Sequence, residues 1–230
     1  MSLRVIITGA SRGLGLEIVR QYLAAGAQVY AAAREPQVGK LAQLAEEHAG
    51  RLTLIELDVL SEPQLQAAVA TVRQQTTALD LLINNAGLNL RGMELGTYER
   101  GAMLEVLHVN AVAPILIGQA FRGLLDQGTA PKLVNLSSQV GSFSWNKSGS
   151  SPLYAASKAA LNMYTRAFAR EGAPIITVAV HPGWVQTDMG GPSAPLAPAQ
   201  AVEQLRSLIA RLTPADNGQF FNYDGRPHPY

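Results

Sequence analysis

One stretch near the start of the chain, from Leu3 to Gly26, limits the possible folds more than any other. An apolar run from Leu3 to Ile7 precedes the sequence Thr8-Gly9-Ala10-Ser11-Arg12-Gly13-Leu14-Gly15, and apolar residues then recur at helical spacing until Gly26. This order predicts a buried strand, a glycine turn and a helix. Such a unit is suited to binding an anion, because glycines allow a tight turn and the helix start presents free N–H groups.

The glycine spacing by itself leaves an alternative open. It is G-x-x-x-G-x-G, whereas the widespread dinucleotide fingerprint is G-x-G-x-x-G. No Lys-Ser or Lys-Thr pair follows the last glycine, which excludes a P-loop. A plain strand-to-helix turn therefore remains possible on these residues alone.

Strands and helices are expected to alternate along the rest of the chain. Apolar runs predict strands at 28–33, 52–57, 79–83, 132–136, 175–180 and 218–223. Helical periodicity predicts helices at 35–49, 98–125, 153–170 and 198–212, and a further helix that Ser61 and Gln64 open with a capping box. Pro114 is expected to kink the long helix. We predict one domain, residues 1–230, with an α/β fold: a Rossmann-like, doubly wound, seven-stranded parallel sheet with helices on both faces.

Polar residues follow the predicted strands at their carboxyl ends. In a doubly wound sheet these ends share one edge, which is where ligands bind. The edge would bring together Gly9–Gly15, Arg34, Asp58, Asn85–Gly87, Ser138 and Pro182-Gly183. This grouping favours a dinucleotide site over a plain turn.

Tyr154 and Lys158 lie four residues apart and are expected to share one face of a helix. An ammonium close to a phenol favours the phenolate, so we expect Lys158 to lower the pKa of Tyr154. A tyrosine tuned in this way can exchange a proton with a carbonyl oxygen during hydride transfer, and Ser138 could donate a hydrogen bond to the same oxygen. An exposed helix pair is the alternative for Tyr154 and Lys158 taken alone.

Five motifs in this order resemble the short-chain dehydrogenase/reductase family over essentially the whole chain. They are Thr8–Gly15, Asn84-Asn85-Ala86-Gly87, Val134-Asn135-Leu136-Ser137-Ser138, Tyr154-Ala-Ala-Ser-Lys158 and Pro182-Gly183. The resemblance implies a catalytic tetrad of Asn110, Ser138, Tyr154 and Lys158. It assigns proton transfer to Tyr154, polarisation of the substrate to Ser138, and tyrosine tuning and ribose binding to Lys158. Asn110 would support a water that supplies protons to the lysine.

The resemblance also implies the cofactor contacts. They are Gly9, Ser11, Arg12, Gly13, Leu14 and Gly15 in the turn, Arg34, Asp58 and Val59, then Asn85, Ala86 and Gly87, and finally Tyr154, Lys158, Pro182, Gly183, Val185 and Thr187. Arg34 stands where an acidic residue would select NAD, and Arg12 adds a second guanidinium. Two guanidiniums suit a 2′-phosphate, so NADP(H) is expected over NAD(H).

The substrate mouth is expected near four apolar side chains. The gap between Ser138 and Tyr154 is longer than is common in the family, and the segment 184–198 is short and rich in proline. The residues placed near the mouth are Phe143, Trp145, Trp184 and Met189, although ordinary packing would explain them equally well. Further segments resemble the branch that contains C-factor-like proteins and sniffer-type carbonyl reductases.

Composition limits the kinds of partner that this protein could bind. The net charge is +1 without a basic stripe, which argues against nucleic acid, and no apolar run reaches the ~18 residues of a membrane span. The chain has no cysteine, its four histidines are scattered, and no metal is expected. His181 is expected to be structural. We predict a cytoplasmic protein, without a signal peptide, that forms a homodimer or homotetramer.

The function expected from these observations is NADPH-dependent reduction of a small aldehyde or ketone, or the reverse oxidation of an alcohol. A second possibility is a nucleotide-binding signalling or sensor protein of the C-factor type with little turnover. An epimerase or dehydratase acting on a nucleotide sugar ranks last, because the chain lacks the extra domain such enzymes usually carry.

Overall fold

The computed structural model describes residues 2–90, 96–172 and 174–230. Within these residues seven strands form one parallel sheet in the order β3-β2-β1-β4-β5-β6-β7. The strands are β1 (Arg4–Thr8), β2 (Gln28–Ala33), β3 (Leu52–Glu56), β4 (Leu81–Asn84), β5 (Lys132–Leu136), β6 (Ile176–His181) and β7 (Phe220–Asn222). The order reverses between β1 and β4, which is the point where a doubly wound sheet binds its ligand. The predicted fold class is therefore confirmed.

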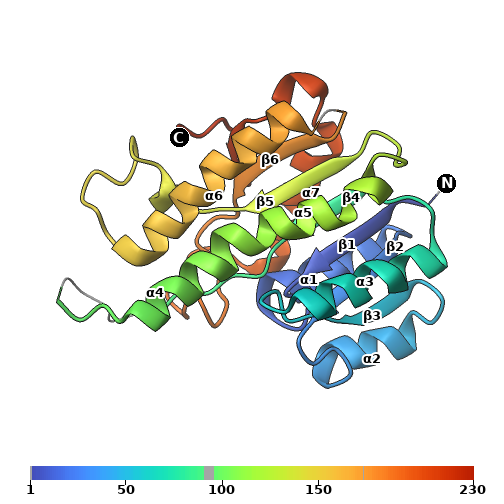
Figure 1. Cartoon of the computed structure of the whole chain (residues 1–230). Helices are drawn as coiled ribbons and strands as arrows, with labels where there is room; N and C mark the ends of the chain where they lie inside the picture. The colour runs from blue at the N-terminus through green and yellow to red at the C-terminus, as the bar shows by residue number, and fades with distance from the viewer. Residues whose placement is uncertain (1, 91–95, 173) are drawn as a thin grey trace.

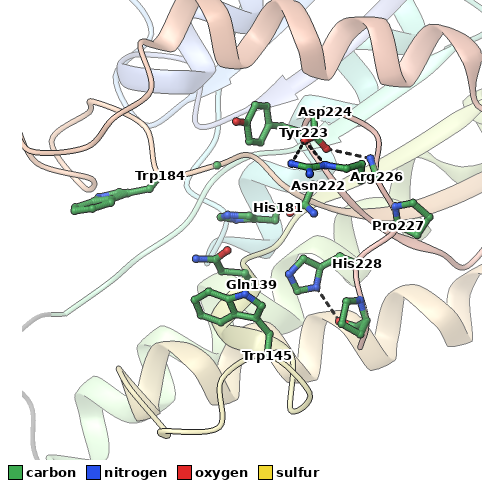
Figure 2. Close-up of a pocket in the computed structure, with 12 residues that line it drawn as sticks. Gln139, Trp145, His181, Trp184, Asn222, Tyr223, Asp224, Arg226, Pro227 and His228 are labelled. Atoms are coloured by element: carbon green, nitrogen blue, oxygen red, sulfur yellow. Dashed lines mark hydrogen bonds and ion pairs between the residues drawn. The ribbon is translucent and has the colours of Figure 1, made fainter.

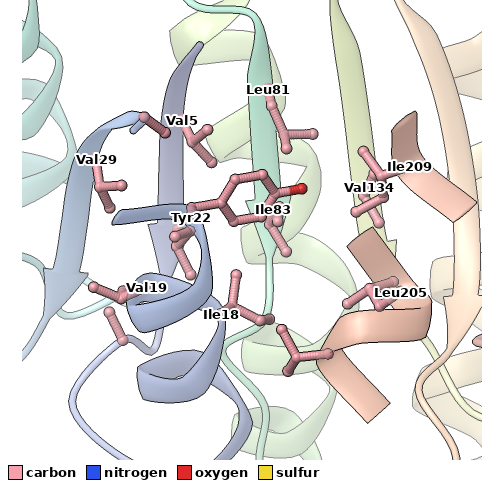
Figure 3. Close-up of a cluster of buried hydrophobic side chains, with 14 of the residues drawn as sticks. Val5, Ile18, Val19, Tyr22, Val29, Leu81, Ile83, Val134, Leu205 and Ile209 are labelled. Carbon is pink, nitrogen blue, oxygen red and sulfur yellow. The ribbon is translucent and has the colours of Figure 1, made fainter. Parts of the chain in front are cut away.

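Helices cover both faces of the sheet (Figure 1). They are α1 (Gly13–Ala24), α2 (Gly39–Glu47), α3 (Glu62–Gln75), α4 (Arg100–Leu107), α5 (Ala113–Leu125), α6 (Pro152–Glu171) and α7 (Pro198–Arg211). On one face Ile18 and Leu205 belong to the same apolar cluster as Val5 and Ile83 (Figure 3). Strands buried on both faces read as continuous apolar runs, which is why their positions could be predicted.

The start of α2 and the cap of α3 differ from the expectation. Helix α2 begins at Gly39 rather than at residue 35, and Gly39 has a positive φ of 69°. Ser61 caps α3 by accepting the Gln64 N–H at 3.4 Å. The Gln64 side chain, however, accepts the N–H of Asp58 at 2.5 Å, so only half of the predicted capping box forms. Residues 91–95 of the loop expected after β4 lie outside the described residues.

The long helix predicted at 98–125 is interrupted before Pro114. A π-helical turn, η1 (His108–Val112), joins α4 to α5, and the N–H of Ala113 donates to the carbonyl of His108, five residues back. Pro114 stands in the first turn of α5, where its missing N–H costs little. The interruption places Asn110 inside a π turn, a local geometry that often marks a functional site.

The combined run Arg100–Leu125 contains an 18-residue window with a mean hydropathy of 1.5. The expectation that no stretch is long and apolar enough for a membrane span is therefore wrong by length and mean hydropathy. A helix packed in a protein core can have the same length and hydropathy, so these two properties are weak evidence for a span. Here Ile117 and Phe121 are buried against the sheet, and 39% of the window is buried.

Candidate active site

The glycine turn after β1 has the shape of a phosphate cradle. Gly9 and Gly13 have positive φ values of 66° and 54°. A Cβ on Gly9 would lie 2.9 Å from the Cα of Ala86, and one on Gly15 would collide with the carbonyl oxygen of Gly9. Glycine is therefore needed both for the turn and for close packing of the segments around it, as a dinucleotide pyrophosphate requires.

Hydrogen bonds tie the end of β1 to the end of β4. The hydroxyl of Thr8 accepts the N–H groups of Asn85 and Ala86, both at 3.1 Å. The amide of Asn85 donates to the carbonyls of Thr8 (2.8 Å) and Gly9 (3.0 Å). The predicted cofactor residues at the switch point thus form one connected unit. Thr8 belongs to this unit although it was not among the predicted residues.

Ser138 and Tyr154 are brought together at the end of β5. Ser138 is close enough to the Tyr154 phenol to counteract part of the pKa shift that burial causes. Ser138 opens a short 3-10 turn, η2 (Gln139–Gly141), and accepts the N–H of Val140 at 3.4 Å. A Cβ on Gly141 would lie 2.7 Å from that of Lys158, so this turn packs directly against α6. That close packing is what brings the serine to the tyrosine.

The pKa of Tyr154 moves in the direction opposite to the expectation. Burial raises it to about 12, and the hydrogen bond from Ser138 offsets this only in part. Lys158 is 4% exposed, and desolvation lowers the pKa of its ammonium to about 8. Its Nζ donates to the carbonyl of Leu136 at 2.8 Å and lies 5.6 Å from the centre of the Tyr154 ring. The lysine is close to the tyrosine, but burial and the neighbouring Ser138, rather than the lysine charge, determine the pKa of the phenol.

Asn110 fastens the loop after β4 to α6. Its side chain accepts the N–H of Leu88 at 2.8 Å and donates to the carbonyl of Leu88 at 2.7 Å. It also donates to the hydroxyl of Ser157 at 3.0 Å, which in turn donates to the carbonyl of Tyr154 at 2.7 Å. A Cβ on Gly87 would lie 3.4 Å from the Asn110 side-chain oxygen and 3.9 Å from the Lys158 nitrogen. Asn110 and Lys158 therefore both approach Gly87.

A buried polar network beneath the site was missed from sequence. The Asn84 amide donates to the side chain of Asn135 at 2.8 Å and to the carbonyl of Pro114 at 3.0 Å. Asn135 donates to the hydroxyl of Thr165 at 2.9 Å. The available signal was an asparagine near the end of each of two apolar strands, since buried amides are usually fully hydrogen-bonded.

The two arginines predicted to recognise a 2′-phosphate are exposed near the glycine turn and at the end of β2. Arg12 lies 3.6 Å from Asp188, with both side chains mostly exposed. Arg34 follows the last residue of β2. Asp58 is half-buried and accepts the N–H of Leu60 at 3.0 Å. The ion pair between Arg12 and Asp188 is exposed and therefore weak. Arg12 can thus exchange Asp188 for a phosphate dianion.

The segment after β6 lies against the glycine turn. Gly183 has a φ of 88°, and a Cβ there would lie 2.7 Å from Leu196. A Cβ on Gly13 would lie 3.4 Å from the side chain of Thr187. Thr187, one of the cofactor contacts that the resemblance implies after β6, is thus beside Gly13 of the glycine turn.

A cavity of about 450 Å³ lies beyond Ser138, at the ends of β6 and β7. Trp145 and Trp184 line it, as does His181, which was expected to be only structural (Figure 2). Phe143 is 86% exposed, and neither it nor Met189 is among the described residues of the cavity wall. Two of the four predicted substrate residues therefore line this cavity. Within the described part of the chain, no cluster of three or more His, Asp or Glu side chains is suited to hold a metal.

The geometry can support hydride transfer beside a proton donor. The glycine turn suits a dinucleotide pyrophosphate, because its glycines allow a tight turn that leads into the start of α1, where free N–H groups favour an anion. Tyr154 and Ser138 offer two hydroxyls to one acceptor, and Lys158 lies next to them.

Comparison with known proteins gives a consistent result. Residues 4–195 match the family model described as short chain dehydrogenase. The chain is 38% identical over 157 residues to the C-signal protein of Myxococcus xanthus, covering 67% of this chain and 95% of the relative. It is 31% identical over 250 residues to the short-chain dehydrogenase srdF of Neurospora crassa, covering 98% and 97%.

Solved structures show the same fold over the full length. The carbonyl reductase Sniffer of D. melanogaster has a TM-score of 0.93 and 32% identity. The NADPH-bound carbonyl reductase from chicken fatty liver has a TM-score of 0.90 and 34% identity. Both comparisons cover 100% of each chain.

Proposed function

This chain belongs to the short-chain dehydrogenase/reductase family of NAD(P)-dependent oxidoreductases, and from that premise we propose that it is a carbonyl reductase that uses NADPH to reduce a small aldehyde or ketone. The observation that carries the proposal is that Ser138, Tyr154 and the buried Lys158 lie together at the end of β5. Similarity to an NADPH-bound carbonyl reductase supports it.

The cofactor preference rests on charge. We assign recognition of the 2′-phosphate to Arg12 in the glycine turn and Arg34 directly after β2, because two exposed guanidiniums suit a phosphate dianion. The residue after β2 is an arginine and not the acidic residue that would select NAD. The glycine turn and the start of α1 would hold the pyrophosphate. When bound, the cofactor supplies the hydride that the carbonyl carbon accepts.

The side chains of the site manage the proton. A carbonyl oxygen held by the hydroxyls of Ser138 and Tyr154 gains negative charge as the hydride arrives, and the phenol then gives up its proton to that oxygen. With a pKa of about 12, Tyr154 is protonated at neutral pH. Burial therefore keeps the phenol in the form that reduction needs, which favours reduction over alcohol oxidation at that pH.

The proposal is tested by following NADPH oxidation with a broad panel of aldehydes and ketones, with NADH in parallel. We expect turnover of at least one carbonyl compound and a clear preference for NADPH. Equal use of NADH would contradict the cofactor assignment.

A second candidate function is signalling, with the dinucleotide as a ligand and little turnover. The observation in its favour is the 38% identity to the Myxococcus xanthus C-signal protein. Tight NADPH binding without turnover of any carbonyl compound would favour this candidate over the reductase.

A further inference from the structure

Three side chains on one face of α6 approach the segment that carries Ser138. Tyr154, Lys158 and Asn162 follow one another at intervals of four residues, so they lie along the same side of the helix. Lys158 is attached to the last residue of β5, since its Nζ donates to the carbonyl of Leu136 at 2.8 Å. Asn162 is the member of the three to which the proposed proton transfer gives no role.

Asn162 holds the chain on both sides of Ser138. Before the serine, the hydroxyl of Ser137 donates to the side-chain oxygen of Asn162 at 2.6 Å. After it, the side-chain nitrogen of Asn162 donates to the carbonyl of Gly141 at 3.4 Å. The second hydrogen bond is long, so the first is the stronger of the two. Ser138 therefore stands in a short segment that a single amide bridges.

The two hydrogen bonds fix the orientation of the Asn162 amide. The carbonyl of Gly141 can only accept, so the amide nitrogen faces it and the amide oxygen faces Ser137. Asn162 and Ser137 are each only 3% exposed, and a buried polar group that loses its partner is costly. Leucine at this position would make neither hydrogen bond, and an ionised aspartate would turn a second acceptor toward the carbonyl of Gly141.

Backbone hydrogen bonds hold the same segment to β6 and to its own turn. The N–H of Ser137 donates to the carbonyl of Val180 at 2.8 Å, and the N–H of Gly141 donates to the carbonyl of Ser138 at 3.0 Å. A Cβ on Gly141 would lie 2.7 Å from the backbone carbonyl carbon of Lys158, so the turn already lies against α6. The amide of Asn162 adds direct hydrogen bonds to the helix that carries Tyr154.

We propose that Asn162 is a positioning residue that holds the Ser138 hydroxyl where it and the Tyr154 hydroxyl can reach one carbonyl oxygen. The proposal rests on the proposed carbonyl reductase function. It gives Asn162 no contact with the reacting atoms, so the effect of Asn162 on the rate should pass entirely through Ser138.

The kinetic test uses Asn162→Leu, which keeps the approximate size of the side chain and removes both hydrogen bonds. On an aldehyde that the native protein reduces, kcat should fall by about 10- to 100-fold, the loss expected when a catalytic group is displaced by about 1 Å. The NADPH dissociation constant should change little. Ser137→Ala removes the shorter hydrogen bond from the other side and should lower kcat in the same way, which keeps the test valid if Asn162→Leu does not fold. Native kcat in either folded variant would overturn the proposal.

Asn217→Leu is the matched control. Both atoms of the Asn217 amide also link α6 to a strand, since the nitrogen donates to the carbonyl of Ala169 at 2.9 Å and the oxygen accepts the N–H of Thr177 at 2.8 Å. These partners lie at the end of α6 and the start of β6, away from Ser138. Asn217→Leu should therefore lose stability but keep its kcat. An equal loss of kcat in Asn217→Leu and Asn162→Leu would overturn the proposal.

A double-mutant cycle separates the positioning of Ser138 from a general structural role. Ser138→Ala alone should lower kcat by about 10²–10³-fold, because it removes one donor to the developing oxyanion. In that background Asn162→Leu should cause no further loss, since the hydroxyl that Asn162 positions is gone. The same fold loss from Asn162→Leu in both backgrounds would show that Asn162 acts independently of Ser138, and would overturn the proposal.

Amide hydrogen exchange, measured by NMR, tests the positioning without turnover. The N–H of Gly141 should exchange faster in Asn162→Leu than in the native protein or in Asn217→Leu, because the turn has lost its attachment to α6. Faster exchange in that variant, with no turnover of any carbonyl compound by the native protein, would support the positioning and overturn the reductase. Turnover by the native protein, with unchanged exchange at Gly141 in Asn162→Leu, would leave the reductase intact and overturn the positioning.

Discussion

At the scale of single residues, burial shifts the pKa values of Tyr154 and Lys158 in opposite directions. Burial favours the neutral form of each, so it raises the pKa of the phenol and lowers that of the ammonium. The phenol thereby stays a proton donor. The lysine, in contrast, is held in a place where its charge is costly, which is characteristic of functional rather than stabilising side chains.

The first prediction follows from this cost. Lys158→Met should unfold at a higher denaturant concentration than the native protein at pH 7, with a gain of ~1–3 kcal/mol, because it removes a buried charge of lowered pKa. The gain is reduced by loss of the hydrogen bond to Leu136. Activity should be lost in the same variant, as the resemblance to the family implies.

The lowered pKa of Lys158 also makes the free energy of unfolding depend on pH. The lysine pKa is about 8 when folded and 10.5 ordinarily, so the unfolded chain holds the extra proton between these values. Stability from this group therefore rises with pH from about 8 to 10.5, and the penalty is fully present below pH 8. The advantage of Lys158→Met should shrink over that interval. A Met variant that is less stable at pH 7 would contradict this account of the lysine.

The second prediction concerns Arg34. Arg34→Asp should weaken NADPH binding by one to two decades and improve NADH binding, because a charge-assisted bond is worth ~1.5–3 kcal/mol and the new carboxylate repels a 2′-phosphate. Dissociation constants for both cofactors can be measured by calorimetry. Arg170→Asp is the control, since Arg170 is 81% exposed at the end of α6 and pairs with Glu171. Unchanged NADPH affinity in Arg34→Asp would show that Arg34 has no part in the preference.

At the scale of elements, the bounds of the strands could be predicted more closely than the π turn η1 that joins α4 to α5. Strands β2 and β5 have the predicted bounds, because continuous apolar runs end at clear polar residues. The π turn at Asn110 could not be predicted from periodicity. It depends on contacts of Asn110 with Leu88 and Ser157, which are distant in sequence.

The third prediction tests the first element, the glycine turn. Gly15→Ala should destabilise the protein by ~1–3 kcal/mol and weaken NADPH binding, because its methyl group would collide with the Gly9 carbonyl. Gly101→Ala in α4 is the control, since a Cβ there meets nothing within 4 Å. That variant should be neutral or more stable by up to ~1 kcal/mol. Thermal unfolding with and without NADPH measures both effects, and a tolerated Gly15→Ala would argue against the cradle.

At the scale of the whole molecule, large apolar side chains remain exposed on α4, η1, α5 and α6. Leu104 is 60% exposed and Met163 is 66% exposed, and Val112 and Leu116 are also exposed. Helix α6 packs against both α4 and α5. We predict that these side chains form one apolar face, which is typical of an interface.

The fourth prediction is that this face joins two copies of the chain. The double variant Leu104→Glu, Met163→Glu should sediment as a monomer of 24.5 kDa, whereas the native protein should sediment as a dimer or tetramer. Val38→Glu, at a residue 59% exposed before α2, is the control and should leave the assembly unchanged. A native protein that is monomeric at micromolar concentration would refute the interface.

The proximity of Ser138, Tyr154 and Lys158 could be predicted from sequence, whereas the cavity wall could not. Tyr154, Lys158 and Ser138 carry local motifs whose spacing is fixed by one helix and one strand end. His181 and His228 come together only because β6, β7 and residues 226–230 fold together. Neither the pairing of these histidines nor the burial that raises the pKa of Tyr154 has a local sequence signal.

The central claim, that Tyr154 gives the proton in NADPH-dependent carbonyl reduction, is tested most directly by Tyr154→Phe. This change keeps the ring and its packing but removes the phenol that Ser138 bonds. On a substrate that the native protein reduces, kcat should fall by at least ~10²–10⁴-fold, while the NADPH dissociation constant changes little. Near-native kcat in Tyr154→Phe would contradict the account.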